Sequence, residues 1–289
     1  MALKLADTVF AGFGVIRREP LMVLAWGVAY FVLLIAAMVG GVVLVGGRAM
    51  MTANAANDPS AAMGMVGSMF AIVLLMIPVF LIIASIFNCA VYRSILRPEE
   101  RSFARLRLGA DELRQALVMF TSALLFFIGY IVCVVVGVIA ATISRDFGAV
   151  LMVLIILGYW VGFYTFFSFA GPMTFAKKKF LLFAGGDLVA KRFWPLLGSY
   201  ALLGLIIFVL YLVVFGVQMA IMGASMTNFQ SAAMQASPLT GGFTAATILN
   251  MVVSGVIGAF MIPILIAPAA VAYRDISGPD VNKQADVFA

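Results

Sequence analysis

The residues best suited to chemistry are the charged ones gathered between Ala90 and Val118. This stretch, AVYRSILRPEERSFARLRLGADELRQALV, holds six arginines and four acids in a chain of which only 10% is charged. Guanidinium groups bind phosphates and carboxylates through paired hydrogen bonds. The stretch is therefore a candidate contact for lipid headgroups or for a partner protein. The alternative is that its arginines pair with the neighbouring acids. The candidate residues are Arg97, Arg101, Arg105 and Arg107.

Side chains for catalysis are scarce elsewhere in the chain. There is no histidine, which is the commonest general base and metal ligand. Cys89 and Cys133 form no Cys-x-x-Cys pair, and both fall in apolar stretches where cysteine serves as a packing residue. Gly185 and Gly186 with Lys191 lack the spacing of a phosphate-binding P-loop. We therefore expect no enzymatic activity, no metal and no cofactor, and no nucleic-acid partner.

Three amide side chains fall within otherwise apolar stretches: Asn88, Gln218 and Asn250. Such amides usually form hydrogen bonds to a neighbouring helix, but they could also bind the polar group of a ligand. An aromatic run from Tyr159 to Phe169 also has two interpretations, one as a ligand site and one as packing. It could line a cavity for an acyl chain, although such runs more often face lipid or pack between helices.

Six apolar stretches exceed the roughly 20 residues that a spanning helix needs. None has a charged residue in its central part, and none alternates as the strands of a β-barrel would. The chain is 65% hydrophobic, and no segment outside these stretches is long enough for a soluble domain. We predict one all-α membrane domain over residues 1–289. Its expected spans are 21–46, 65–92, 116–143, 147–175, 195–222 and 244–273.

The distribution of basic residues predicts the orientation. Of the 18 Lys and Arg residues, all but Arg48 and Arg145 fall before span one, between spans two and three, between spans four and five, or after span six. Basic residues accumulate on the cytoplasmic side of membrane proteins. We expect both termini to be cytoplasmic, in the inner membrane of a bacterium. The expected outer loops are near 47–64, 143–147 and 223–243.

Each pair of spans follows a polar lead-in, at 3–20, 99–115 and 177–194. In the first, Leu5, Val9 and Phe13 share one helical face, which predicts an amphipathic helix in the membrane interface. In the second, Phe103, Leu106 and Leu113 form a narrower stripe, and we expect a helix docked flat. The third has no clean stripe and should break at Gly185–Gly186. The expected fold is three helical hairpins with interfacial helices. Similar hairpin exits favour an internal threefold repeat, but the usual aromatic and basic residues at cytoplasmic exits explain them equally well.

Three segments together resemble a known group of proteins: AGFGVIRREPLMVLAW, YRSILRPEERSFARLRLGADELRQ and FAGPMTFAKKKFLLFAGGDLVAKRFWPLLG. The chain looks like the uncharacterised six-span membrane proteins of alphaproteobacteria. More distantly, it resembles the membrane domain fused to some glycerophosphodiester phosphodiesterases. The resemblance implies a membrane location and a fold. It implies no reaction, because the catalytic domain of those enzymes has no counterpart in this sequence.

Two functional classes are consistent with the sequence. The first is a non-enzymatic membrane component that assembles with, or supports, other envelope proteins. The second is a transporter or binder of a hydrophobic or lipid-like molecule. Membrane lipids are expected partners in both classes, and other membrane proteins in the first. A midplane cavity lined by the amides would favour the second class, whereas a solid bundle would favour the first.

Overall fold

The computed structural model describes residues 5–41, 59–100, 103–222 and 245–277, and within these ranges it is helical with no strand. Six helices in the described part of the chain are long and apolar enough to cross a membrane, as the sequence predicts. The elements are α1 Leu5–Val9, α2 Ala11–Arg18, α3 Pro20–Gly41, α5 Pro59–Leu96, η2 Phe103–Arg105, α6 Ala110–Ile143, α7 Arg145–Phe167, α8 Ala170–Lys177, α9 Gly186–Ala190, α10 Phe193–Met222 and α12 Ala245–Ser277.

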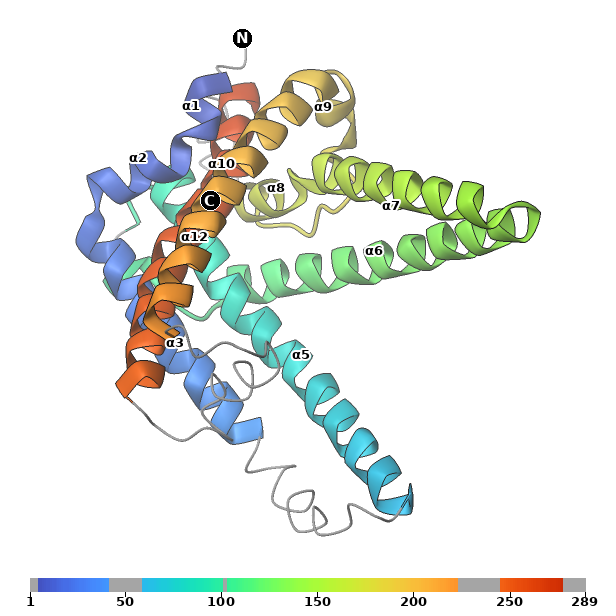
Figure 1. Cartoon of the computed structure of the whole chain (residues 1–289). Helices are drawn as coiled ribbons and strands as arrows, with labels where there is room; N and C mark the ends of the chain where they lie inside the picture. The colour runs from blue at the N-terminus through green and yellow to red at the C-terminus, as the bar shows by residue number, and fades with distance from the viewer. Residues whose placement is uncertain (1–4, 42–58, 101–102, 223–244, 278–289) are drawn as a thin grey trace.

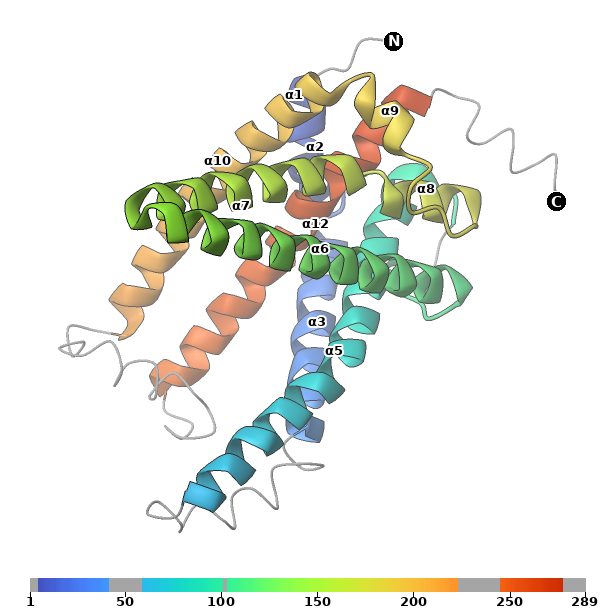
Figure 2. The same cartoon turned by 90° about the vertical axis from the view of Figure 1, so that its right-hand side faces the viewer.

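The six long helices fall into two groups (Figures 1 and 2). Helices α3, α5, α10 and α12 share a broadly common course, whereas the hairpin of α6 and α7 runs across them in both views. The hairpin meets the other helices mainly at its base, where α6 contacts α5 and α8, and α7 contacts α9 and α10. The three hairpins are therefore not alike, because α3 packs chiefly on α12 whereas α6 and α7 pack chiefly on each other.

A packed core joins the first and last long helices to α5. Val23 and Trp26 of α3, Phe87 of α5, and Ala259 and Ala267 of α12 are all buried in one cluster. Small residues allow the close approach: there is no room for a side chain at Gly27, whose missing Cβ would overlap Ala259. This core fixes the positions of α3, α5 and α12 relative to one another.

The first lead-in forms two short helices that pack against protein. Helices α1 and α2 contact α12, and α1 also contacts α10. Gly12 of α2 lies directly on the backbone of Pro263 and Ile264, where any Cβ would overlap. The expectation that this segment lies in the membrane interface stays a prediction.

The second lead-in differs from its prediction. Residues 99–115 do not form one docked helix: the chain makes the short turn η2, runs without regular structure to Gly109, and starts α6 at Ala110. Ala104 and Arg105 have φ values of 47° and 56°, a left-handed conformation that interrupts any α-helix. The predicted stripe is also split, since Leu106 packs against the core whereas Leu113 is exposed.

Span four and the third lead-in are divided as well. The predicted span 147–175 is interrupted after Phe167, and α8 follows from Ala170 with Pro172 in its first turn, where the missing N–H is tolerated. The chain is irregular from Lys178 until α9 begins at Gly186, near the predicted break. Of the expected outer loops, 223–243 and most of 47–64 lie outside the described residues, as does Arg101.

Candidate functional site

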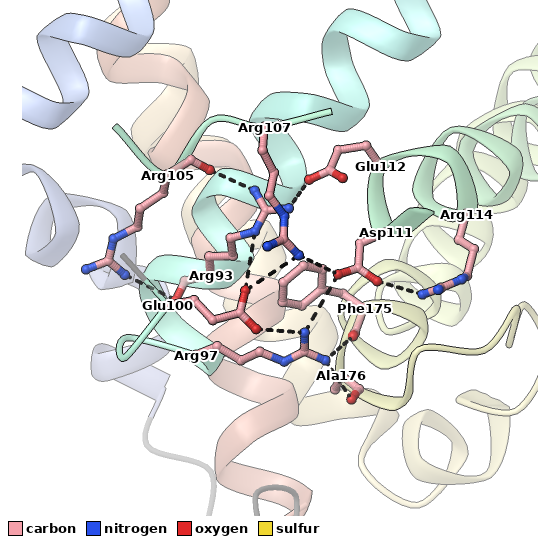
Figure 3. Close-up of polar contacts among 10 residues, drawn as sticks. All are labelled: Arg93, Arg97, Glu100, Arg105, Arg107, Asp111, Glu112, Arg114, Phe175 and Ala176. Atoms are coloured by element: carbon pink, nitrogen blue, oxygen red, sulfur yellow. Dashed lines mark hydrogen bonds and ion pairs between the residues drawn. The ribbon is translucent and has the colours of Figure 1, made fainter. Parts of the chain in front are cut away.

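The charged stretch folds into a compact cluster where α5 ends and α6 begins (Figure 3). The cluster, named here the charge cluster, joins the last turns of α5, the connection to α6, the first turns of α6, and α8. Its members are Arg93, Arg97, Glu100, Arg105, Arg107, Asp111, Glu112 and Arg114, with Glu19 at its edge.

The centre of the charge cluster is the ion pair between Arg93 and Glu112. Both side chains are fully buried, and Arg93 donates a hydrogen bond to Glu112. The guanidinium of Arg93 also donates to the carbonyl of Arg105 at 2.7 Å and lies 3.8 Å from Glu100. A buried guanidinium needs several acceptors to replace its lost water, and both terminal nitrogens of Arg93 have one, whereas its Nε has none among the described residues.

Asp111 forms a second centre beside the first. Its carboxylate accepts hydrogen bonds from Arg114 at 2.6 Å and Arg107 at 3.3 Å, and Arg97 is 3.7 Å away. Arg97 in turn donates to the carbonyls of Phe175 and Ala176 at 2.9 and 3.2 Å. Its guanidinium carbon lies 4.7 Å from the centre of the Phe175 ring, a cation–π distance. These contacts attach α8 to the junction of α5 and α6.

The left-handed turn at η2 brings the connection into the cluster. The carbonyl of Ala104 accepts a hydrogen bond from the indole nitrogen of Trp26 at 2.6 Å, which holds the turn against α3. The following residue, Arg105, donates to Glu19 at 2.9 Å at the corner between α2 and α3. The turn therefore has support from both sides, which offsets the cost of its backbone conformation.

Most charges of the cluster are paired within the protein. The cluster therefore serves to hold α5, α6 and α8 together. Of the sequence candidates, Arg97 and Arg105 pair with acids and are largely buried. Arg107 also pairs with acids but remains 48% exposed, which leaves it able to reach a phosphate. A contact between these arginines and lipid headgroups or a partner therefore stays a prediction.

A second polar site lies among the long helices. A cavity of about 560 Å³, named here the midspan cavity, opens between α3, α5, α10 and α12. Its wall is largely aliphatic and aromatic, and it includes the amides of Asn88 and Gln218 and the tyrosines Tyr30 and Tyr211. No Asp, Glu, Lys or Arg lines it among the described residues. The structure thus brings two of the three predicted amides to one cavity. Asn250 lies in α12, but its side chain is outside the described set.

The contacts of Asn88 leave its amide available to a ligand. Its Nδ2 donates to the sulfur of Met119 at 3.2 Å, and a thioether is a weak acceptor. A carbonyl or hydroxyl oxygen in the cavity would be a stronger partner for the same nitrogen. Tyr30, Tyr211 and Gly258, which sequence reasoning missed, complete the wall.

The aromatic run of span four lies elsewhere. Tyr159 donates a hydrogen bond to the carbonyls of Leu125 and Phe126 at 3.1 Å and stacks on the Phe126 ring, with centroids 5.5 Å apart. Trp160 and Tyr164 are exposed. The run therefore packs between α6 and α7 or faces outward, except that Phe169, beyond the end of α7, is buried against Tyr273 of α12. None of these aromatic residues lines the midspan cavity.

Cys89 and Cys133 are both buried free thiols. Within the part of the chain that the structure describes, no cluster of His, Cys, Asp and Glu could hold a metal ion. Comparison of the chain with protein-family models, with curated proteins and with solved structures gave no match, so the functional argument rests on these two sites.

Proposed function

We propose that this multi-pass membrane protein binds a lipid-like or hydrophobic small molecule in the midspan cavity. One observation carries the proposal: an apolar cavity contains two amide side chains from different helices, Asn88 of α5 and Gln218 of α10. Ligand sites are typically concave and mostly apolar, with a few polar groups that set orientation. Of the two classes that the sequence leaves open, this geometry favours the binder.

The wall of the cavity also limits the ligand's chemistry. Amides and phenolic hydroxyls can both donate and accept hydrogen bonds, but none of them neutralises a charge. An ionic headgroup would lose its hydration without gaining a counter-ion. The fitting ligand therefore combines hydrocarbon with a neutral carbonyl or hydroxyl. A volume of about 560 Å³ suits a small amphiphile or one part of a larger lipid.

A role as a non-enzymatic component of envelope assemblies is the second candidate, and the α6–α7 hairpin favours it. Apolar side chains are exposed on both of its helices, including Phe127, Val138, Val153 and Trp160. In a membrane these side chains would contact lipid tails or another apolar helix. Association through this hairpin and ligand binding in the cavity are compatible with each other.

Filling the cavity tests the binding proposal. Gly258 lines the cavity, and a Cβ built there meets nothing within 4 Å. Gly258→Leu should therefore fold and occupy the space. Native mass spectrometry of protein released from its own membranes should show a retained small molecule in the original chain, and several-fold less in the variant.

A matched control shows whether any loss of the retained molecule comes from filling the cavity or merely from adding a leucine to a helix. Gly162 of α7 is equally open but lies outside the cavity wall. Gly162→Leu should retain the molecule at the original level. Equal retention in both variants, or no retained molecule in any of them, would refute the proposal.

The orientation proposal has a separate test. Single cysteines at Ser102 and Ser237 are placed in the cytoplasmic and outer segments that the basic residues predict. In intact spheroplasts a membrane-impermeant thiol reagent should label position 237, and position 102 only after lysis. The reverse pattern would invert the proposed topology.

A further inference from the structure

A second hollow, larger than the midspan cavity, lies beside the N-terminal helices α1 and α2. It is an open groove of about 980 Å³ lined by α1, α2, the end of α5 and the end of α12, which gather at one end of the molecule (Figure 2). We name it the terminal groove. Its lining includes Ala11, Val15, Arg18, Ile95, Val271 and Arg274.

The terminal groove is separate from the midspan cavity. The cavity uses Gly258, Ile262 and Leu265, which recur at helical spacing on one face of α12. Helix α2 packs on another face, at Pro263 and Ile264, and the groove lies beyond it at Val271 to Asp275. No residue lines both hollows.

The groove combines an apolar floor with a charged rim. Ala11, Val15, Ile95 and Val271 supply aliphatic surface, while charged side chains come from all the surrounding helices except the end of α5. This differs from the midspan cavity, whose described wall carries no charge. A ligand of the groove therefore needs both hydrocarbon and charge.

The two cations of the rim, Arg18 and Arg274, have few partners within the protein. The side chain of Arg18 makes no hydrogen bond or ion pair with any residue that the structure describes. Among the residues that the structure describes, Arg274 pairs only with its neighbour Asp275, at 3.3 Å, and is half exposed. Glu19 accepts from Arg105 through one carboxylate oxygen, Asp275 accepts from Arg274 through one, and Asp7 has a partner of its own.

We infer that the terminal groove binds the headgroup of a zwitterionic phospholipid. Arg18 and Arg274 provide donors for the phosphate. The second carboxylate oxygens of Asp275 and Glu19 are acceptors for an ammonium group. The aliphatic floor covers the first carbons of the acyl chains. A purely anionic headgroup would gain the arginines but face the acids without a cation of its own.

Two neighbouring arginines allow a test of whether binding depends on a side chain that lines the groove. Arg17 and Arg18 are both exposed and both unpaired among the described residues, but only Arg18 lines the groove. Binding of short-chain phosphatidylethanolamine to the full chain in detergent can be titrated by native mass spectrometry. Arg18→Gln should weaken binding about tenfold, as expected for one charge-assisted contact. Arg17→Gln should leave it unchanged.

Three probes show whether the groove recognises a zwitterionic lipid headgroup, an anionic lipid headgroup or free phosphate. Phosphatidylglycerol should bind several-fold more weakly than phosphatidylethanolamine, and inorganic phosphate should not displace either lipid at millimolar concentration. Equal losses for the two arginine variants would overturn the inference, because they would indicate diffuse surface attraction. Displacement by free phosphate, or preference for the anionic lipid, would also overturn it. Gly258→Leu should not change this titration, so failure here is distinguishable from failure of the midspan proposal.

Discussion

The charge cluster and the midspan cavity both place polar side chains among apolar helices, but they do so in opposite ways. In the charge cluster, nearly every guanidinium meets a carboxylate or a carbonyl oxygen of the chain. In the midspan cavity, Asn88 has only a thioether sulfur as its hydrogen-bond partner among the described residues, and space remains beside it. A site that is saturated internally stabilises the protein, whereas one with weak partners and room can bind a ligand.

Breaking the buried pair should have the largest effect. Glu112→Gln keeps the shape but leaves Arg93 charged and buried without its carboxylate. Loss of one partner of such a pair costs about 3–5 kcal/mol. Unfolding in mixed micelles would measure the change in the free energy of unfolding.

The matching double variant sharpens this prediction. Arg93→Met with Glu112→Leu removes both charges, and it should recover at least half of the loss, because no uncompensated charge stays buried. A loss below about 1 kcal/mol for Glu112→Gln alone would show that the pair is solvated, against the burial seen here.

Two glycines, Gly12 of α2 and Gly258 of α12, give the next contrast. Gly12 lies on the backbone of α12 with no room for a Cβ, so Gly12→Ala should force α2 away and cost about 1–3 kcal/mol. Gly258→Ala enters open space and should change stability by less than about 0.5 kcal/mol. Thermal unfolding of the two variants side by side checks this. Equal destabilisation would mean that the cavity is as tightly packed as the α2 contact.

Asn88→Leu should separate stability from binding. The variant gives up a weak hydrogen bond to Met119 and gains apolar surface, so the free energy of unfolding should change by about 1 kcal/mol or less. The molecule retained in native mass spectrometry should fall several-fold. A variant that loses stability strongly yet retains the molecule would assign Asn88 to packing.

Arg107→Gln should have the smallest effect. Its ion pairs with Glu100 and Asp111 lie at the exposed side of the cluster, at 3.7 and 3.3 Å. Exposed pairs contribute under about 1 kcal/mol, and added salt should reduce even this. A loss comparable to that of Glu112→Gln would erase the distinction between the centre of the cluster and its edge.

The sequence predicts the number and approximate bounds of the long helices well, because length and hydropathy determine both. The course of α6 and α7 could not be predicted, since helices with apolar residues on all sides give no information about which face meets which neighbour. The left-handed turn at Ala104 and Arg105 also leaves no signal, because neither residue is a glycine or an asparagine.

The sites were predictable to different degrees. Pairing of Arg97 and Arg107 with nearby acids follows from their spacing to Glu100 and Asp111. The pairing of Arg105 with Glu19 joins distant segments and needs the fold. Asn88 and Gln218 are conspicuous as amides in apolar runs, but their shared cavity depends on how α5 and α10 lie about α12.

Photolabelling with a neutral lipid tests the central claim most directly. A monoacylglycerol carrying a diazirine in its chain would be added to vesicles that contain the full protein, and adducts would be mapped by mass spectrometry. We expect adducts concentrated on the cavity wall, around Phe215 and Met261. Gly258→Leu should reduce them several-fold and Gly162→Leu should not. Labelling spread evenly over the outer faces of α7 and α10, and unchanged by Gly258→Leu, would contradict ligand binding in the midspan cavity.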